Sequence, residues 1–331
     1  MKAAINTRYG GPEVVSLAEI PRPRPGKGEV LVRVAAAGVT TADWRLRAAA
    51  FPGAIMATVG RLMFGLFRPR NPVLGSDYAG TVVEVGKGVT DFAPGDRVYG
   101  FSGGGAHAEY LVAKAGGAIA PLPAGLSDAE AAALPFGGQT ALEFLGRFAA
   151  VKPGERVLVL GASGGVGVYA VQVARALGAE VTGVASGGNL ALVESLGAAH
   201  TVDYRKTDPA GLTGPYDVVF DTIGALDYAR AAPMLAPGGR FVPLTYGLRD
   251  VWLGRKAKRN GHRQIVAVNG DSREGLDRLS DMVAAGQLRP VIDRVYPFEA
   301  IREAHAHVDS RRRKGAVIVT IEPGKAQLKV A

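Results

Sequence analysis

The sequence predicts an α/β protein in which a β-rich part is joined to a doubly wound parallel sheet. In the first third, short β-forming runs alternate with turns rich in glycine and proline. From about residue 124, apolar strands alternate with helical patterns instead. The 331 residues are 47% hydrophobic and 21% charged, a composition that suits one large or two ordinary folded domains.

Four β-forming runs are expected in the first third, at residues 2–5, 14–19, 29–36 and 78–85. Turn signals such as Gly10-Gly11-Pro12 and Pro94-Gly95-Asp96 punctuate this part of the chain. One segment, residues 51–70, is apolar, broken by glycine and ended by arginines, and matches neither a clean strand nor a well-capped helix. Two interpretations stay open for it: part of the core, or a mobile wall over a pocket.

The remaining elements alternate as in a parallel sheet covered on both faces. Strands are expected at 156–160, 180–185, 200–203, 217–222, 240–244 and 264–268. The helices among them are expected at 167–177, around 190–196, and in a segment ending at Pro237-Gly238-Gly239. The tail adds helix 273–285, strand 291–296, helix 298–308 and strand 316–321.

The chain contains no cysteine, which excludes disulfides, thiolate zinc sites, iron–sulfur clusters and cysteine nucleophiles. Its five histidines form no i,i+4 pair, and no G-x-S-x-G elbow is present, so metal catalysis and a serine hydrolase are both disfavoured. No signal peptide or spanning segment is recognised. We therefore expect a cytoplasmic protein without a membrane partner.

The net charge of +9 is concentrated in residues 249–263, expected to be a loop before the sixth strand, and in residues 311–314. A nucleic-acid or anionic-membrane surface is one interpretation of such patches. A solvated surface, or a rim that attracts a phosphorylated ligand, is the simpler one.

The strongest local motif is Gly161-Ala162-Ser163-Gly164-Gly165-Val166-Gly167, between an expected strand and an expected helix. Such a turn lets backbone N–H groups approach a pyrophosphate at a helix N-terminus, so it predicts a Rossmann dinucleotide site. Residues 184–189, at the end of the next strand, include no carboxylate to hold the ribose 2′-hydroxyl of NAD. This favours NADP(H) over NAD(H), with Tyr204, Arg205 and Lys206 as a ring and two cations nearby.

The order of several motifs resembles the medium-chain dehydrogenase/reductases, in particular their zinc-independent, quinone-oxidoreductase-like (zeta-crystallin-like) branch, over essentially the whole chain. The motifs include Gly28-Glu29-Val30, Ala42-Asp43-Trp44, Gly75-Ser76-Asp77, Pro94-Gly95-Asp96-Arg97-Val98 and Gly138-Gln139-Thr140. The resemblance implies a GroES-like catalytic domain at 1–123 and 270–331, a Rossmann domain at 124–269, and an active site in the cleft between them. It also suggests a homodimer joined at the sheet edge near residues 264–268.

The resemblance also implies site residues. Zinc-dependent relatives place a cysteine at the position of Thr40 and a His-Glu pair at Ser76-Asp77, so neither zinc nor any other metal is expected here. Candidate catalytic donors are Thr40, Tyr78 and His107. The implied cofactor contacts are Thr140, Ser163, Gly164, Gly165, Val166, Ser186, Asn189, Tyr204, Ala225, Leu244, Thr245, Tyr246, Val268, Asn269 and Gly270.

Motif and resemblance together predict an NADPH-dependent enzyme that transfers hydride to a small molecule, a quinone or an α,β-unsaturated carbonyl. Residues 51–67, Phe101, Phe136 and Tyr246 are expected to form its apolar pocket. Two alternatives stay open. One is an enoyl-thioester reductase whose substrate phosphate contacts residues 249–263, and the other is a non-catalytic NADPH-binding protein, crystallin-like or RNA-associating.

Overall fold

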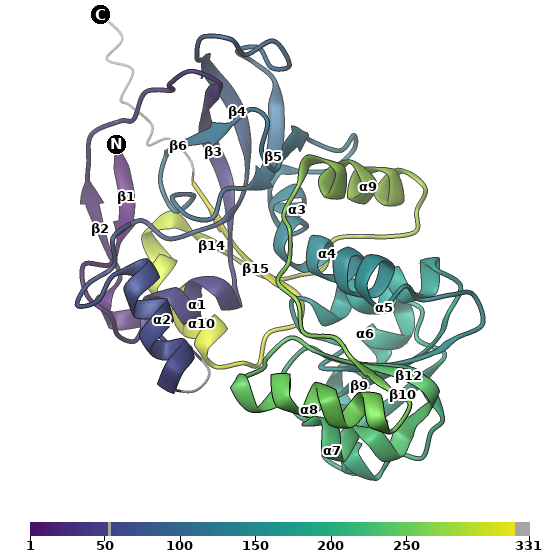
Figure 1. The fold of residues 1–331 in the computed structure, drawn as a ribbon. Helices are drawn as coiled ribbons and strands as arrows, with labels where there is room; N and C mark the ends of the chain where they lie inside the picture. The colour runs from purple at the N-terminus through teal and green to yellow at the C-terminus, as the bar shows by residue number, and fades with distance from the viewer. Residues whose placement is uncertain (52–53, 322–331) are drawn as a thin grey trace, which may run out of the picture.

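The computed structural model describes residues 1–51 and 54–321, which form two large sheets in separate halves of the molecule and one two-stranded sheet (Figure 1). One sheet is mainly antiparallel and the other is parallel, so the predicted fold class is confirmed. Positions 52 and 53 of the expected pocket wall lie outside the described residues.

The antiparallel part combines the first third of the chain with its tail. Its strands are β3 (Glu29–Val39), β4 (Asp77–Val85), β5 (Arg97–Phe101), β6 (Tyr110–Lys114), β7 (Ile119–Pro121), β14 (Ile292–Pro297) and β15 (Ala316–Thr320). They follow the order β14-β15-β3-β4-β5-β7, with β6 also paired to β3. Strands β1 (Lys2–Ile5) and β2 (Ser16–Glu19) form a separate pair. Because β15 pairs with β3, with Val317 opposite Val39, the tail completes the N-terminal domain.

The parallel sheet is built from the middle of the chain. Its strands are β8 (Arg156–Leu160), β9 (Glu180–Ala185), β10 (His200–Asp203), β11 (Tyr216–Asp221), β12 (Leu235–Pro243) and β13 (Arg263–Gln264). In the order β10-β9-β8-β11-β12-β13, the chain adds β9 and β10 on one side of β8 and then returns to add β11, β12 and β13 on the other side. The strand order therefore reverses between β8 and β11, while all the strands stay parallel. In open sheets of this kind, ligands bind beyond the carboxyl ends of the strands at such a reversal.

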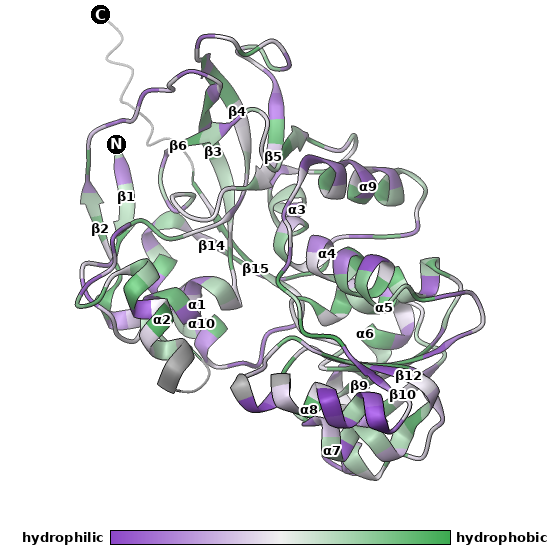
Figure 2. Ribbon diagram, viewed as in Figure 1, coloured by the Kyte–Doolittle hydropathy of each residue, from purple (hydrophilic) through white to green (hydrophobic). Residues whose placement is uncertain are grey.

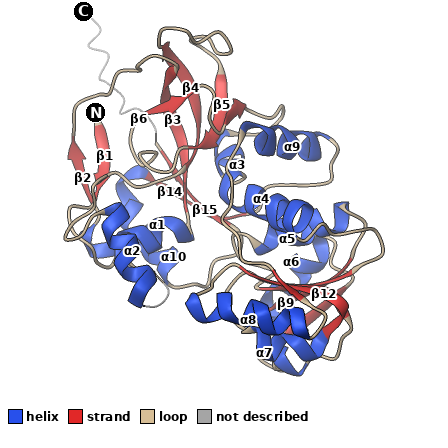
Figure 3. Cartoon of the chain, viewed as in Figure 1, coloured by secondary structure: helices blue, strands red, loops and turns tan. Residues whose placement is uncertain are grey.

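Helices cover both faces of the parallel sheet (Figure 3). The helices of the chain are α1 (Thr41–Ala48), α2 (Ala54–Phe64), α3 (Asp128–Ala132), α4 (Pro135–Ala141), the π-helix Leu142–Phe148, α5 (Gly167–Ala176), α6 (Leu190–Ser195), α7 (Tyr228–Ala231), α8 (Leu248–Arg259), α9 (Arg273–Ala284) and α10 (Ile301–Asp309). In strand β8, Val157 and Val159 pack into the cluster that contains α5, and Leu158 and Leu160 into the one that contains α7. This alternation explains why the strand is apolar throughout.

Three expectations for this domain are wrong in detail. Helix α7 ends at Ala231 and is followed by a 3-10 turn, Ala232–Met234, well before Pro237, because Pro233 has no N–H for an α-helical hydrogen bond; β12 begins at Leu235. Of the expected sixth strand, 264–268, only Gln264 pairs with β12, together with Arg263 just before it. Residues 248–259, expected to be a loop, form helix α8, whose side chains are mostly hydrophilic (Figure 2).

The ends of α8 explain why this segment is helical. The Gly247 N–H donates to the Asp250 carboxylate over 2.8 Å, which satisfies a free backbone donor at the helix start. Lys256, Lys258 and Arg259 occupy the last turn, where positive charge favours the helix dipole.

Hydrogen bonds link the two domains. The Phe136 N–H, on α4, donates to the Asp77 carboxylate of the N-terminal domain over 3.2 Å. The Gly315 N–H, just before β15, donates to the Ser163 carbonyl in the glycine-rich turn over 2.9 Å. The tail therefore supports the predicted phosphate site directly. Among the described residues, no helix has the length and apolar character needed to cross a membrane.

Candidate functional site

The glycine-rich turn lies at the carboxyl end of β8, where the strand order reverses. Gly161 has a φ of +75°, which favours glycine. Gly167 opens α5 so close to the strand that a Cβ there would lie 2.0 Å from the Gly161 carbonyl oxygen. A Cβ on Gly164 would meet only that same oxygen, at 3.3 Å. The turn thus fits the close approach of a pyrophosphate to a helix N-terminus.

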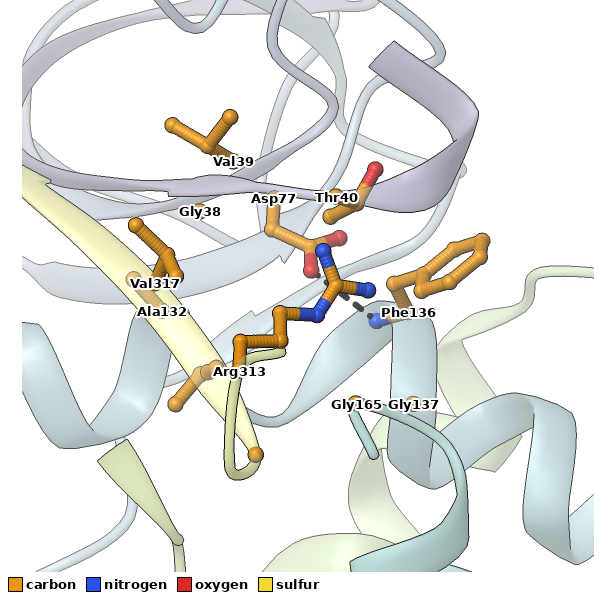
Figure 4. Close-up of a pocket in the computed structure, with 13 residues that line it drawn as sticks. Gly38, Val39, Thr40, Asp77, Ala132, Phe136, Gly137, Gly165, Arg313 and Val317 are labelled. Carbon is orange, nitrogen blue, oxygen red and sulfur yellow. Dashed lines mark hydrogen bonds between the residues drawn. The ribbon is translucent and has the colours of Figure 1, made fainter. Parts of the chain in front are cut away.

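Arg313, which the sequence analysis did not single out, lies against this turn. Its Nη2 atom would be 2.9 Å from a Cβ on Gly165, and it donates to the Thr41 hydroxyl over 2.7 Å. Figure 4 shows the guanidinium reaching between Asp77 and Phe136. Burial lowers the pKa of Arg313 to about 10, so the side chain is still charged at neutral pH. A cation therefore stands beside the turn where the phosphate charge would lie.

Two buried carboxylates face this cation. Asp43 accepts hydrogen bonds from the Thr40 N–H and hydroxyl, each over 2.7 Å, and from the Gly75 N–H over 2.9 Å. Asp77 accepts from the Phe136 N–H over 3.2 Å. Burial, together with the charge of Asp43, raises the pKa of Asp77 well above its ordinary range. The positive charge of Arg313 offsets part of this cost.

The three candidate catalytic donors make internal contacts. Thr40 caps α1, and its hydroxyl donates to Asp43 over 2.7 Å. Tyr78 is fully buried in the core of the N-terminal domain, where burial raises the pKa of its phenol. His107 is also fully buried, with Nε2 3.0 Å from the Gly38 carbonyl oxygen. These contacts favour structural roles for Thr40 and His107. The Tyr78 hydroxyl is enclosed without a hydrogen-bond partner among the described residues.

The predicted adenosine side of the site follows β9. The Asn189 amide donates to the Ser163 hydroxyl over 3.1 Å, so the structure brings these two predicted contacts together. Tyr204, at the end of β10, is half-exposed. Sequence reasoning missed one carboxylate here, because it comes from the neighbouring strand β10. Asp203 lies 2.6 Å from where a Cβ on Gly187 would be, and it accepts from the Arg205 N–H over 3.0 Å.

A lysine at position 188 is expected to strengthen NADPH binding relative to NADH. A Cβ on Gly188 would meet no atom within 4 Å, so the Gly188→Lys side chain has room beside the predicted 2′ site. A new charge-assisted contact to a 2′-phosphate should lower the Kd for NADPH about tenfold and leave NADH binding nearly unchanged. Fluorescence titration of both cofactors measures the ratio, with Gly188→Ala as the control. An equal change for both cofactors would place residue 188 away from the 2′-phosphate.

The predicted nicotinamide side is formed by segments that contact one another. The Tyr246 hydroxyl donates to the Ala267 carbonyl over 3.2 Å, which joins the segment of Leu244, Thr245 and Tyr246 to the one before Val268. Thr140 is buried in α4 and donates to the Phe136 carbonyl over 2.6 Å. Ala225 lies in the loop after β11, where its carbonyl accepts a hydrogen bond from Arg230 over 3.2 Å.

Arg45 crosses from the N-terminal domain to this side of the site. It lies on α1, and its Nη2 atom donates to the Thr245 hydroxyl over 2.8 Å. Burial, and to a smaller degree the charge of Arg311, lowers the pKa of Arg45. Sequence reasoning missed this residue, because nothing in the local pattern predicts a partner 200 positions away.

Asp271 makes the stability of this region depend on pH. Its carboxylate accepts from the Asn269 amide over 2.8 Å, and burial raises the pKa of Asp271 from 3.8 to about 6. The folded chain thus holds this proton more tightly than the unfolded chain. The contribution of the protonated Asp271 carboxyl to the unfolding free energy is complete below about pH 4 and is lost as the pH rises through about 6.

The Asp271→Asn variant removes this titration, so it should lose less stability than the wild type between about pH 4 and 6. Urea unfolding of both proteins across this range measures the difference in unfolding free energy. Parallel pH profiles would show that Asp271 titrates normally.

A cavity of about 120 Å³ opens beside the site, under α2. Its lining includes Tyr9, Asp43, Leu46, Met63, Phe64 and Ser76. Met63 and Phe64 belong to the apolar segment expected to border a pocket, which agrees with its interpretation as a wall. Phe136, another expected pocket residue, lines the smaller cavity between Asp77 and Arg313 (Figure 4).

These features define a class of protein: a two-domain oxidoreductase with a dinucleotide turn facing a GroES-like domain. A family model described as "Alcohol dehydrogenase GroES-like domain" matches residues 26–124, and one described as "Zinc-binding dehydrogenase" matches residues 196–319.

Related proteins agree with this class. A chloroplastic quinone-oxidoreductase, QR1, of Triphysaria versicolor is 31% identical over 96% of this chain and 98% of its own. A chloroplastic NADPH-dependent alkenal/one oxidoreductase of Arabidopsis thaliana is 33% identical over 96% and 79%. The solved structure of Escherichia coli quinone oxidoreductase complexed with NADPH has a TM-score of 0.82 and 26% identity, covering 97% of this chain and 100% of that one. The chain therefore belongs to the medium-chain dehydrogenase/reductase superfamily, in its quinone-oxidoreductase-like branch, and is an oxidoreductase.

Proposed function

We propose that this protein reduces a quinone or an α,β-unsaturated carbonyl with NADPH and without zinc. The observation that carries the proposal is the glycine-rich turn at the sheet reversal, with Arg313 against it and a cavity in the N-terminal domain that Leu46, Met63 and Phe64 help to line. The names of the relatives support the same acceptors and the same cofactor.

The residues present fit the cofactor, whose reduced nicotinamide supplies a hydride when bound. The backbone N–H groups of Ser163, Gly165 and Val166, together with Arg313, would hold the pyrophosphate. The Gly164 N–H donates to the Gly161 carbonyl over 2.9 Å and closes the turn, so Gly164 would contribute by having no side chain. Ser186, Asn189 and Tyr204 would surround the adenosine ribose. Thr140, Ala225, Leu244, Thr245, Tyr246, Val268, Asn269 and Gly270 would contact the nicotinamide half. Arg45, bonded to Thr245, would fix the position of that segment across the cleft.

The donor set at the family's zinc position supports chemistry without zinc. Thr40, Ser76 and Asp77 stand where zinc-dependent relatives have ligands, and hydroxyl groups bind zinc poorly. The Thr40 hydroxyl is also held by Asp43, and burial raises the pKa of Asp77, which disfavours the anionic form a metal needs. Among the described residues, no group of three or more histidine and carboxylate side chains could hold a metal ion.

An electron-poor acceptor suits this site because such an acceptor needs orientation more than activation by a metal. The cavity under α2 offers the apolar side chains of Leu46, Met63 and Phe64 to a ring or an alkenyl chain. Proton delivery from water would complete the reduction, since Tyr78 and His107 are enclosed in the core.

The function is tested by cofactor titration followed by an acceptor screen on the same sample. We expect tighter binding of NADPH than of NADH, and NADPH oxidation with several quinones and enals. Far greater turnover of an enoyl-CoA would favour the thioester reductase. Tight cofactor binding without turnover, combined with salt-sensitive retention of RNA, would favour the non-catalytic alternative.

We further propose the domain boundaries, the cellular location and the oligomeric state of the protein. The catalytic domain comprises residues 1–123 and 270–331, and the Rossmann domain residues 124–269. The protein acts in the cytoplasm on a small molecule, as a homodimer joined at the β13 edge of the parallel sheet.

A further inference from the structure

Helix α2 presents an apolar surface to solvent. Leu62 is 55% exposed, Met63 62% and Phe67, just beyond the helix, 85%. Val59, Phe64 and Leu66 are also exposed. Val59, Leu62 and Met63 follow the i, i+3, i+4 spacing of one face of α2, and Leu66 and Phe67 lie just beyond the end of the helix at Phe64. We call these six side chains the α2 patch; contiguous exposed apolar surface of this kind marks an interaction site.

Helix α2 is anchored to the domain, in part through Phe64 of the α2 patch itself. Phe51 stacks on Phe64 with ring centroids 5.9 Å apart, which leaves Phe64 41% exposed, and a Cβ on Gly60 would lie 2.6 Å from the Phe51 ring. Arg61 lies over the Tyr9 ring at 5.2 Å, and the Tyr9 hydroxyl donates to the Gly65 carbonyl over 2.5 Å. These contacts position the helix while leaving the α2 patch uncovered.

Positive charge surrounds the α2 patch. Arg61, Arg68 and Arg70 are exposed, and residues 54–70 include no aspartate or glutamate. Apolar side chains among cations complement an anionic lipid surface, in which acyl chains lie beneath negative headgroups. A second copy of this chain is a poorer occupant, because a symmetric contact would bring the same arginines together with no acidic residue of the segment between them.

We propose that the α2 patch docks the protein on anionic lipid bilayers. Helix α2 has 11 residues, too few to span the hydrocarbon core, so it lies in the plane of the interface. The sequence-based expectation of no membrane partner concerned spanning segments, and this surface is a different kind of contact.

The cavity under α2 gives such docking a consequence. Met63 and Phe64 belong to the α2 patch and also line the cavity. A lipophilic acceptor dissolved in the bilayer would therefore reach the site from the lipid side. This consequence rests on the proposed function, whereas lipid binding itself does not.

Vesicle co-sedimentation of the full chain tests the docking without an activity assay. The wild type should sediment with vesicles of phosphatidylcholine containing roughly 30 mol% phosphatidylglycerol, and much less with phosphatidylcholine alone. The Leu62→Glu/Phe67→Glu double variant should lower the partition coefficient at least about tenfold. The Arg68→Glu variant should lower it several-fold at low salt and less at high salt.

Matched controls are available away from α2. Val85→Glu changes an exposed apolar residue at the far end of β4 from the cleft, and Arg278→Glu reverses an exposed charge on α9. Both controls should bind vesicles like the wild type, and thermal melting checks that every variant is folded.

Two results would overturn the proposal. One is equal sedimentation with neutral and anionic vesicles, or no sedimentation with either. The other is a wild type that stays off vesicles but forms an oligomer that Leu62→Glu/Phe67→Glu dissociates in light scattering, which would make the α2 patch a protein interface. If vesicle binding holds while no acceptor is reduced, the docking stands and the proposed function fails.

Discussion

Replacing Arg313 with methionine is expected to raise the Kd for NADPH by about 10- to 100-fold, the range of a lost charge-assisted phosphate contact. The guanidinium lies against Gly165 of the phosphate turn and is the cation nearest the predicted pyrophosphate in this account. Its removal also leaves Asp43 and Asp77 buried without their positive neighbour, so the unfolding free energy should fall as well. Fluorescence titration well below the melting temperature measures the affinity for NADPH separately from the loss of stability.

Two further variants show which contact matters. Arg312→Met removes an exposed arginine one position away and should leave the Kd unchanged. Thr41→Val removes the acceptor of the Arg313 hydrogen bond but keeps the cation. If Thr41→Val weakens NADPH binding as much as Arg313→Met does, Arg313 acts only by joining the domains, and its assignment to the pyrophosphate is wrong.

A single methyl group at position 167 should abolish cofactor binding and lower the unfolding free energy by about 3 kcal/mol or more. A Cβ there would lie 2.0 Å from the Gly161 carbonyl oxygen and 2.8 Å from Ala162 backbone atoms. Because these neighbours are backbone, the clash can be relieved only by moving α5 away from β8, which opens the phosphate turn. Urea unfolding and NADPH titration of Gly167→Ala measure the two effects.

Gly254→Ala is the matched control for this substitution. Gly254 lies within α8, where a Cβ would meet no atom within 4 Å. Alanine there should be neutral or stabilise by up to about 1 kcal/mol through helix propensity, with unchanged cofactor binding. Wild-type stability and affinity in Gly167→Ala would contradict the described strand–helix contact.

The phosphate turn could be predicted from the sequence because its constraints are local. Gly161 needs a positive φ, and Gly167 must let a helix approach a strand. Both positions therefore require glycine, and the glycines are visible in the sequence itself. The alternation of strands and helices predicts parallel strands, whereas the reversal of strand order at β8 is observed in the assembled sheet.

Arg313 could not be singled out in the same way. It stands in a run of four basic residues, and the sequence does not say which of them points inward. In the structure, Arg311 has a φ of 55° and Gly315 a φ of +78°, and the chain between them turns so that Arg313 enters the domain junction. Arg311 instead covers the Trp44 ring at 4.7 Å. This choice depends on the pairing of β15 with β3, a contact between distant parts of the chain.

The candidate catalytic donors show a related limit. Thr40, Tyr78 and His107 were selected by residue type and family position, but donor capacity depends on what each polar atom already contacts. The Thr40 hydroxyl is bound to Asp43, and the His107 Nε2 atom lies beside the Gly38 carbonyl. The Gly38 partner of His107 becomes visible only when the strands are assembled, whereas the Thr40–Asp43 contact is a local capping box at the start of α1.

The most direct test of the account is the steady-state oxidation of NADPH by protein freed of metal with a chelator, using a quinone and an enal as acceptors. A zinc-independent enzyme should have the same kcat/KM before and after chelation for an accepted substrate, with NADPH preferred over NADH. Loss of activity on chelation that added zinc restores would contradict the proposed function, as would the absence of turnover with every acceptor despite NADPH binding.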